Sequence, residues 1–172
     1  MPETLILGIG NILLGDEGFG VTAINYLEEH YEFPQEVRLL DGGTRGLMLL
    51  GEIIECDFLV VLDIMLGGEK PGSIYLVEEE EIPGRVNFQH SMHEANLNDM
   101  LASAELAGNR PRALVFGFEP FDFKALNPSP TPEALKLLPK YCARVAAELA
   151  QRGLDIREKK RRLPGGQTII GE

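Results

Sequence analysis

The sequence predicts an α/β fold: a single domain in which a twisted, mostly parallel central β-sheet has helices on both faces. Short apolar runs alternate along the chain with stretches whose apolar residues recur at helical spacing. This alternation is typical of βαβ units. Several runs are apolar throughout, as expected of strands that are covered on both faces. The chain has 172 residues, 44% of them hydrophobic, which suits one core.

The predicted strands are apolar runs that end at a glycine or at an acidic residue. They cover residues 5–10, 37–40, 58–62, 73–77 and 113–118. The predicted helices cover residues 21–29, 47–54, 94–106 and 132–152. In the last helix we expect Pro132 to open the first turn, Pro139 to produce a kink and Gly153 to end it. The α/β domain therefore spans residues 1–156, and residues 157–172 are predicted to be a basic, flexible tail.

The charge of the chain disfavours several classes of partner. Sixteen Lys and Arg face 27 Asp and Glu, for a net charge of −11, which repels nucleic acid and lipid headgroups. No apolar run approaches the roughly 18–20 residues of a membrane span, and the N-terminus lacks the features of a signal peptide. We therefore expect a cytoplasmic monomer without nucleic-acid or membrane partners. Cys56 and Cys142 are far apart and predicted to be core thiols.

Acidic residues follow the predicted strands, where parallel sheets bind their ligands. Asp16 and Glu17 come after the first strand, Asp41 after the second and Asp63 directly after the third. A carboxylate that follows a run as apolar as residues 58–62 is costly unless it is paired, hydrogen-bonded or bound to metal. Asp63 is therefore a candidate site residue; the alternative is an acid that caps the next loop.

The first loop invites a nucleotide-binding interpretation. Gly8-x-Gly10 begins like a dinucleotide fingerprint and Asp41 could bind a ribose, but Leu13 stands where the third glycine belongs. Asp16 and Glu17 near the start of a helix would also repel a pyrophosphate. We interpret Asp16 as the cap of that helix.

His93 precedes the predicted helix at 94–106. It begins an H-E-x-x-H pattern that fails because residue 97 is Leu, although His90 and His93 could both bind a metal if the segment were helical. The alternative is a hydrogen-bonded structural histidine. Glu17, Asp63 and His93 together would suit a divalent metal with open positions for substrate or water. Such an ion can polarise an amide carbonyl for hydrolysis.

These residues also form a recognisable set of motifs. The set resembles that of the endopeptidases that mature nickel–iron hydrogenases, over about residues 4–152. It consists of Gly8-x-Gly10-Asn11-x-Leu13-x-x-Asp16-Glu17-Gly18-x-Gly20, Asp41-Gly42-Gly43-Thr44, Asp63 and Ser91-x-His93.

The resemblance implies a function and a partner. It implies removal of a short C-terminal extension from the precursor of the hydrogenase large subunit after nickel insertion, with nickel supplied by the substrate. The residues matching the family's nickel contacts are Glu17, Asp63 and His93. The general base stays unassigned, with Asp16 a weak candidate. A nickel-centre chaperone that does not cleave, and less so a nucleotide-binding protein, remain alternatives. Residues 65–66 and 118–123 are candidate contacts for the large subunit, or core packing.

Overall fold

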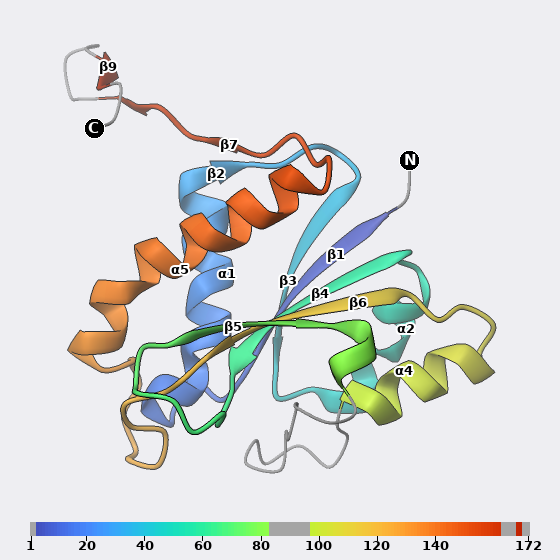
Figure 1. Cartoon of the computed structure of the whole chain (residues 1–172), viewed down its shortest axis with the longest axis horizontal. Helices are drawn as coiled ribbons and strands as arrows, with labels where there is room; N and C mark the ends of the chain where they lie inside the picture. Colours follow the sequence, from blue (N-terminus) through green and yellow to red (C-terminus); the bar gives the residue numbers. More distant parts are fainter. Residues whose placement is uncertain (1–2, 83–96, 163–167, 170–172) are drawn as a thin grey trace.

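A five-stranded sheet forms the centre of the molecule. In the computed structural model, which describes residues 3–82, 97–162 and 168–169, the strand order is β3-β1-β4-β6-β5 (Figure 1). The first four strands in that order are parallel to one another, and β5 is antiparallel at one edge. The strands are β1 (Thr4–Ile9), β3 (Val37–Gly43), β4 (Phe58–Ile64), β5 (Ile74–Glu78) and β6 (Arg112–Phe118). The mostly parallel sheet predicted from the sequence is confirmed.

Helices cover both faces of this sheet (Figure 1). The core between α1 and α5 and the sheet includes Ile24, Tyr141 and Phe116, and the opposite core, with α2 and α4, includes Ile53, Leu101 and Val61. The helices are α1 (Phe19–His30), α2 (Leu50–Ile54), α4 (Leu97–Leu106) and α5 (Pro132–Gln151), and short 3-10 turns are η1 (Gly15–Gly18), η2 (Gly46–Leu49) and η3 (Glu79–Glu81). No helix in the described part of the chain is long and apolar enough to cross a membrane.

The long helix α5 begins and ends at the predicted residues. The Thr131 hydroxyl accepts the Ala134 N–H, Pro132 occupies the first turn, and Gly153 takes the left-handed conformation (φ +99°) just after the end. The fully buried Tyr141 donates its hydroxyl to the Phe116 carbonyl at 2.8 Å. This bond fixes α5 across β6.

Three details differ from or add to the predicted elements. The segment 47–54 is a 3-10 turn followed by a single short helix, so Leu47 is exposed while Leu49 and Ile53 are buried. A two-residue strand β7 (Arg157–Glu158) pairs with β2 (Tyr31–Glu32), next to the end of α1. Beyond it, β8 (Arg161–Arg162) pairs with β9 (Thr168–Ile169).

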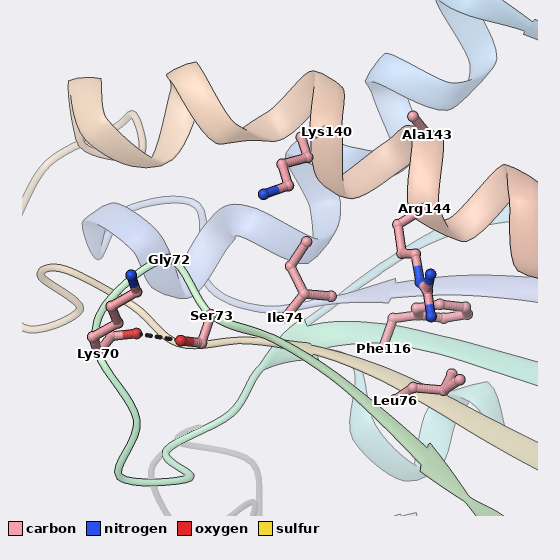
Figure 2. Close-up of a pocket in the computed structure, with 9 residues that line it drawn as sticks. All are labelled: Lys70, Gly72, Ser73, Ile74, Leu76, Phe116, Lys140, Ala143 and Arg144. Carbon is pink, nitrogen blue, oxygen red and sulfur yellow. Dashed lines mark hydrogen bonds between the residues drawn. The ribbon is translucent and has the colours of Figure 1, made fainter.

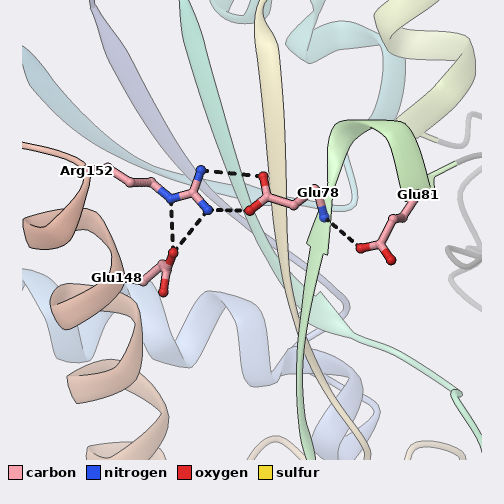
Figure 3. A network of polar contacts seen from close by, with 4 residues as sticks. All are labelled: Glu78, Glu81, Glu148 and Arg152. Carbon is pink, nitrogen blue, oxygen red and sulfur yellow. Dashed lines mark hydrogen bonds and ion pairs between the residues drawn. The ribbon is translucent and has the colours of Figure 1, made fainter.

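An ionic network joins the end of α5 to the end of β5 (Figure 3). The Arg152 guanidinium contacts Glu148 at 3.0 Å and also pairs with Glu78, whose N–H points to the Glu81 carboxylate. All these groups are partly exposed, so each pair contributes less than about 1 kcal/mol. The network orients the two elements more than it stabilises them.

Candidate active site at the carboxyl edge of the sheet

Two acidic side chains, Glu17 and Asp63, are buried together where β1 and β4 end. Each is only 2% exposed. Glu17 lies in η1, directly after the first loop, and Asp63 is the penultimate residue of β4. The first turn of α1 packs against the end of β4, because a Cβ on Gly20 would lie 2.2 Å from the Leu62 carbonyl oxygen. The fold therefore delivers two carboxylates to one buried position.

The first loop uses its glycines to place Glu17. Gly10 has φ +143°, and a Cβ there would lie 1.8 Å from the Glu17 carbonyl oxygen. A Cβ on Gly18 would lie 2.7 Å from the Ile12 Cα. Backbone therefore packs directly on backbone at Gly10 and Gly18. The glycines are needed for this close packing, and not to let a pyrophosphate approach the backbone. This packing removes the main support for a nucleotide site.

Replacing Gly10 by Ala is expected to destabilise the fold by about 2–5 kcal/mol, since the new methyl group meets backbone and the φ angle disfavours it. Gly51→Ala is the matched control, because Gly51 lies in α2 with no atom within 4 Å of an added Cβ. That change should be neutral or stabilising. Urea denaturation of both variants gives the comparison; equal stabilities would contradict the packing described for Gly10.

The negatively charged forms of the two carboxylates are both disfavoured by their surroundings. Burial raises the pKa of Glu17. Burial, and secondarily the charge of Glu17, raises the pKa of Asp63 well above its ordinary value, although the Ile64 N–H donates to Asp63 Oδ1 at 2.8 Å. Glu17 Oε1 is buried without a hydrogen-bond partner among the described residues. Two such groups favour a shared proton or a cation between them.

This pair should make stability fall as pH rises. A carboxyl group whose pKa is raised in the folded state stabilises the fold while protonated, and the contribution is lost between its ordinary pKa and its raised pKa. The ordinary values are 4.5 for Glu17 and 3.8 for Asp63. Urea denaturation between pH 4 and pH 8 should therefore show a steeper loss in the wild type than in a Glu17→Gln, Asp63→Asn double variant. Superimposable profiles would contradict the shifted pKa values.

Asp16 anchors the loop that follows β6. It is fully buried, and its Oδ1 accepts the Thr131 N–H at 2.7 Å. Its Oδ2 accepts the Phe121 N–H at 2.8 Å, the Asp122 N–H at 3.2 Å and the Thr131 hydroxyl at 3.2 Å. The prediction of a helix cap is wrong, because α1 has Gly18 at its N-cap and no side-chain cap. With both oxygens engaged by donors, Asp16 is also poorly suited to act as a general base.

Glu119 is a buried acid that the sequence analysis missed. It follows β6 directly and is 7% exposed. Its Oε2 accepts the Gly67 N–H at 2.8 Å and the Tyr75 hydroxyl, and burial together with this hydrogen bond raises the pKa of Tyr75 to about 12. The rule that selected Asp63, an acid directly after a buried strand, also selects Glu119. Its contacts fix the loop between β4 and β5.

Comparison with known proteins decides the family. The sequence profile described as hydrogenase maturation protease matches residues 21–148. The chain belongs to the hydrogenase maturation protease family. It is accordingly a hydrolase.

Individual relatives agree with this membership. The protease is 40% identical over 156 residues to the hydrogenase expression/formation protein HoxM of Azotobacter vinelandii, covering 89% of this chain and 75% of that protein. It is 38% identical over 111 residues to the hydrogenase 2 maturation protease of Escherichia coli K12, covering 64% of this chain and 68% of that protein. Among solved structures, the hydrogenase maturating endopeptidase HybD of E. coli superposes with a TM-score of 0.83 at 31% identity, covering 91% of this chain and 98% of that one.

The structure does not unite all the predicted site residues of the protease. Asp41 lies in β3 opposite Gly8 but is exposed, so it is not part of the buried pair. His90 and His93 fall outside the described residues, and the membership of His93 in the site stays a prediction. Within the described ranges, no group of three or more His, Cys, Asp or Glu is arranged to hold a metal.

A separate pocket of about 630 Å³ lies between β5 and α5 (Figure 2). Lys70, Lys140 and Arg144 line it over an apolar floor that includes Ile74 and Phe116. Its lining contains no carboxylate or thiol, so its chemistry is opposite to that of Glu17 and Asp63. This pocket therefore offers no site for a cation, in contrast to the buried pair at the carboxyl edge of β1 and β4.

Proposed function

We propose that this protease removes the C-terminal extension of a hydrogenase large-subunit precursor after nickel insertion, and that Glu17 and Asp63 contact the nickel of that precursor. The observation that carries the proposal is the buried pair of carboxylates, with Glu17 Oε1 left without a partner among the described residues. His93 is proposed as the third contact. Nickel is part of the substrate here, as the family resemblance implies.

A divalent ion would stabilise the charged forms of Glu17 and Asp63. Oxygen and imidazole ligands suit Ni²⁺, and a positive charge between Glu17 and Asp63 favours the ionised form of both. Burial raises the pKa of both groups, and both must be deprotonated to bind the ion, so binding of the nickel centre is coupled to the loss of any proton that either group carries. The nickel centre of a nickel-loaded precursor would complete the site by placing a positive charge between the two carboxylates.

The same contacts would position the bond to be cleaved. A substrate metal held by two rigidly placed carboxylates would fix the adjacent peptide in one orientation. The peptide bond to be cleaved would then lie in a defined position relative to the site. The bound metal can also polarise a carbonyl or acidify a water molecule. Recognition through the metal explains why cleavage would wait for nickel insertion: without the ion, the two carboxylates have nothing to bind.

The test is the mass of a large-subunit precursor after incubation with the protease, once with nickel loaded and once without. Loss of a C-terminal peptide only from the nickel-loaded precursor is the expected result. Equal cleavage of both forms would refute recognition through nickel. A stable complex without cleavage would favour the chaperone alternative.

A further inference from the structure

The exposed apolar side chains of the protease are unevenly distributed. Large hydrophobic residues with substantial exposure are Ile12, Leu13, Leu47, Met48, Leu106, Phe121, Leu126 and Leu135. Six of these lie between β1 and α1, between β3 and α2, or between β6 and α5, on segments that follow the carboxyl ends of strands. Leu135 lies in the first turn of α5, and Leu106 ends α4 and leads into the start of β6, toward the opposite edge of the sheet.

We infer that six of these residues form a docking surface for the folded large-subunit precursor, an inference that rests on the proposed function. This surface, the apolar rim, consists of Ile12, Leu13, Leu47, Met48, Phe121 and Leu126. Single exposed hydrophobic residues are common on proteins. These six follow the carboxyl ends of β1, β3 and β6, at the edge of the sheet that also holds the buried carboxylates, and such a concentration of exposed apolar side chains indicates an interaction site.

Two segments of the rim are held together by backbone hydrogen bonds. The Asn127 N–H donates to the Leu13 carbonyl at 2.9 Å, and the Gly15 N–H donates to the Asn127 carbonyl at 3.0 Å. Leu13 and Leu126 therefore lie on directly connected segments, although 113 positions separate them in the sequence. Figure 1 shows the two segments together, the loop after β6 beside η1.

Asp16 fixes this arrangement from below the surface. Its carboxylate holds the N–H groups of Phe121, Asp122 and Thr131, and its own N–H donates to the Asp122 carbonyl at 2.8 Å. The next residue is Glu17. The buried turn at Asp16 thus connects the part of the rim that follows β1 and β6 directly to the proposed nickel contact Glu17. A protein bound to that part of the rim would be held at a fixed position relative to Glu17. A preformed surface of this kind loses little conformational entropy on binding.

The occupant of the rim follows from its position. Whatever covers these side chains lies over the edge where Glu17 and Asp63 are buried. A second copy of this chain bound there would compete with any substrate for that edge, whereas the precursor must come to it. Of the apolar residues predicted from the sequence for this contact, Met65 and Phe118 are buried in the core. Leu66 and Phe123 are half-buried, and Phe121 is exposed and belongs to the rim.

The rim is tested with the polar substitutions Leu13→Asn and Met48→Asn, which lie on separate elements and are 53% and 83% exposed. Leu106→Asn is the matched control at 91% exposure. Binding to the nickel-loaded precursor is measured by surface-immobilised titration, and cleavage by mass. Each rim variant should bind about tenfold more weakly, the effect of losing one buried apolar side chain from an interface, while the control stays at wild-type affinity.

Two results would overturn the inference: wild-type affinity in both rim variants, or an equal loss in Leu106→Asn. Melting temperatures of all three variants should stay close to that of the wild type because these side chains are exposed. If Leu13→Asn is less stable than the wild type, the affinity of Met48→Asn for the precursor tests the rim in its place. Failure of the proposed function gives a different result from failure of the rim: the wild-type protein would then bind the precursor without cleaving it.

Discussion

Glu17→Gln is expected to lose cleavage of the nickel-loaded precursor by about 100-fold or more while melting at a higher temperature than the wild type at pH 8. The loss follows from removal of a carboxylate proposed to bind nickel; even residues that only support a metal ligand cost about 10–100-fold when replaced. The stabilisation follows because a buried carboxylate with a raised pKa is replaced by a neutral amide of the same shape. A gain of about 1 kcal/mol corresponds to roughly 2–4 °C.

Asp41→Asn is the matched control for this variant. Asp41 is an acid at the same edge of the sheet, but it is exposed. Its replacement should leave the melting temperature within about 1 °C, since surface substitutions have small effects. Calorimetry and the mass-based cleavage assay are run on both proteins at pH 8. The proposed role of Glu17 would be contradicted if Glu17→Gln melted at a lower temperature than the wild type or cleaved the precursor at the wild-type rate.

The second large effect concerns Asp16. Asp16→Ala is expected to lower the free energy of unfolding by about 3–5 kcal/mol, because three N–H groups and one hydroxyl lose their acceptor at a buried position. This corresponds to a drop in melting temperature of roughly 10 °C. Urea denaturation at neutral pH measures the difference.

Asp122→Ala provides the comparison for Asp16. Asp122 also accepts two backbone N–H groups, those of Lys124 and Ala125, but it is exposed, and water can replace its carboxylate. We expect a loss below about 1.5 kcal/mol. If the two variants were equally destabilised, the loop after β6 would not depend on its buried anchor.

Much of the fold follows from local patterns in the sequence. The runs that became β1, β4 and β6 are apolar throughout because both faces of the sheet are covered, and Pro132 and Gly153 mark the ends of α5 for backbone reasons. The direction of β5 could not be predicted in this way. An edge strand shows the same short apolar pattern whether it runs parallel or antiparallel.

The site was predictable where a local rule applies. Asp63 stands out because an acid directly after a buried strand needs a reason, and Glu17 because it belongs to a motif. The partners of Asp16 are 105 to 115 positions away, so no local pattern could separate an anchor of a distant loop from a helix cap. Glu119 also follows a buried apolar strand directly, as Asp63 was predicted to do, and the same pattern therefore predicts it as a buried acid. His93 lies outside the described residues and stays a prediction.

The most direct measurement is the nickel-edge X-ray absorption spectrum of the nickel-loaded precursor, alone and mixed with the protease, frozen before turnover. Direct contact predicts additional oxygen neighbours at about 2.0–2.2 Å, the range for carboxylates on a transition metal such as Zn²⁺. These neighbours should be reduced in the Glu17→Gln, Asp63→Asn double variant. An unchanged nickel spectrum in a mixture that goes on to cleave the precursor would contradict the proposal that Glu17 and Asp63 bind the metal.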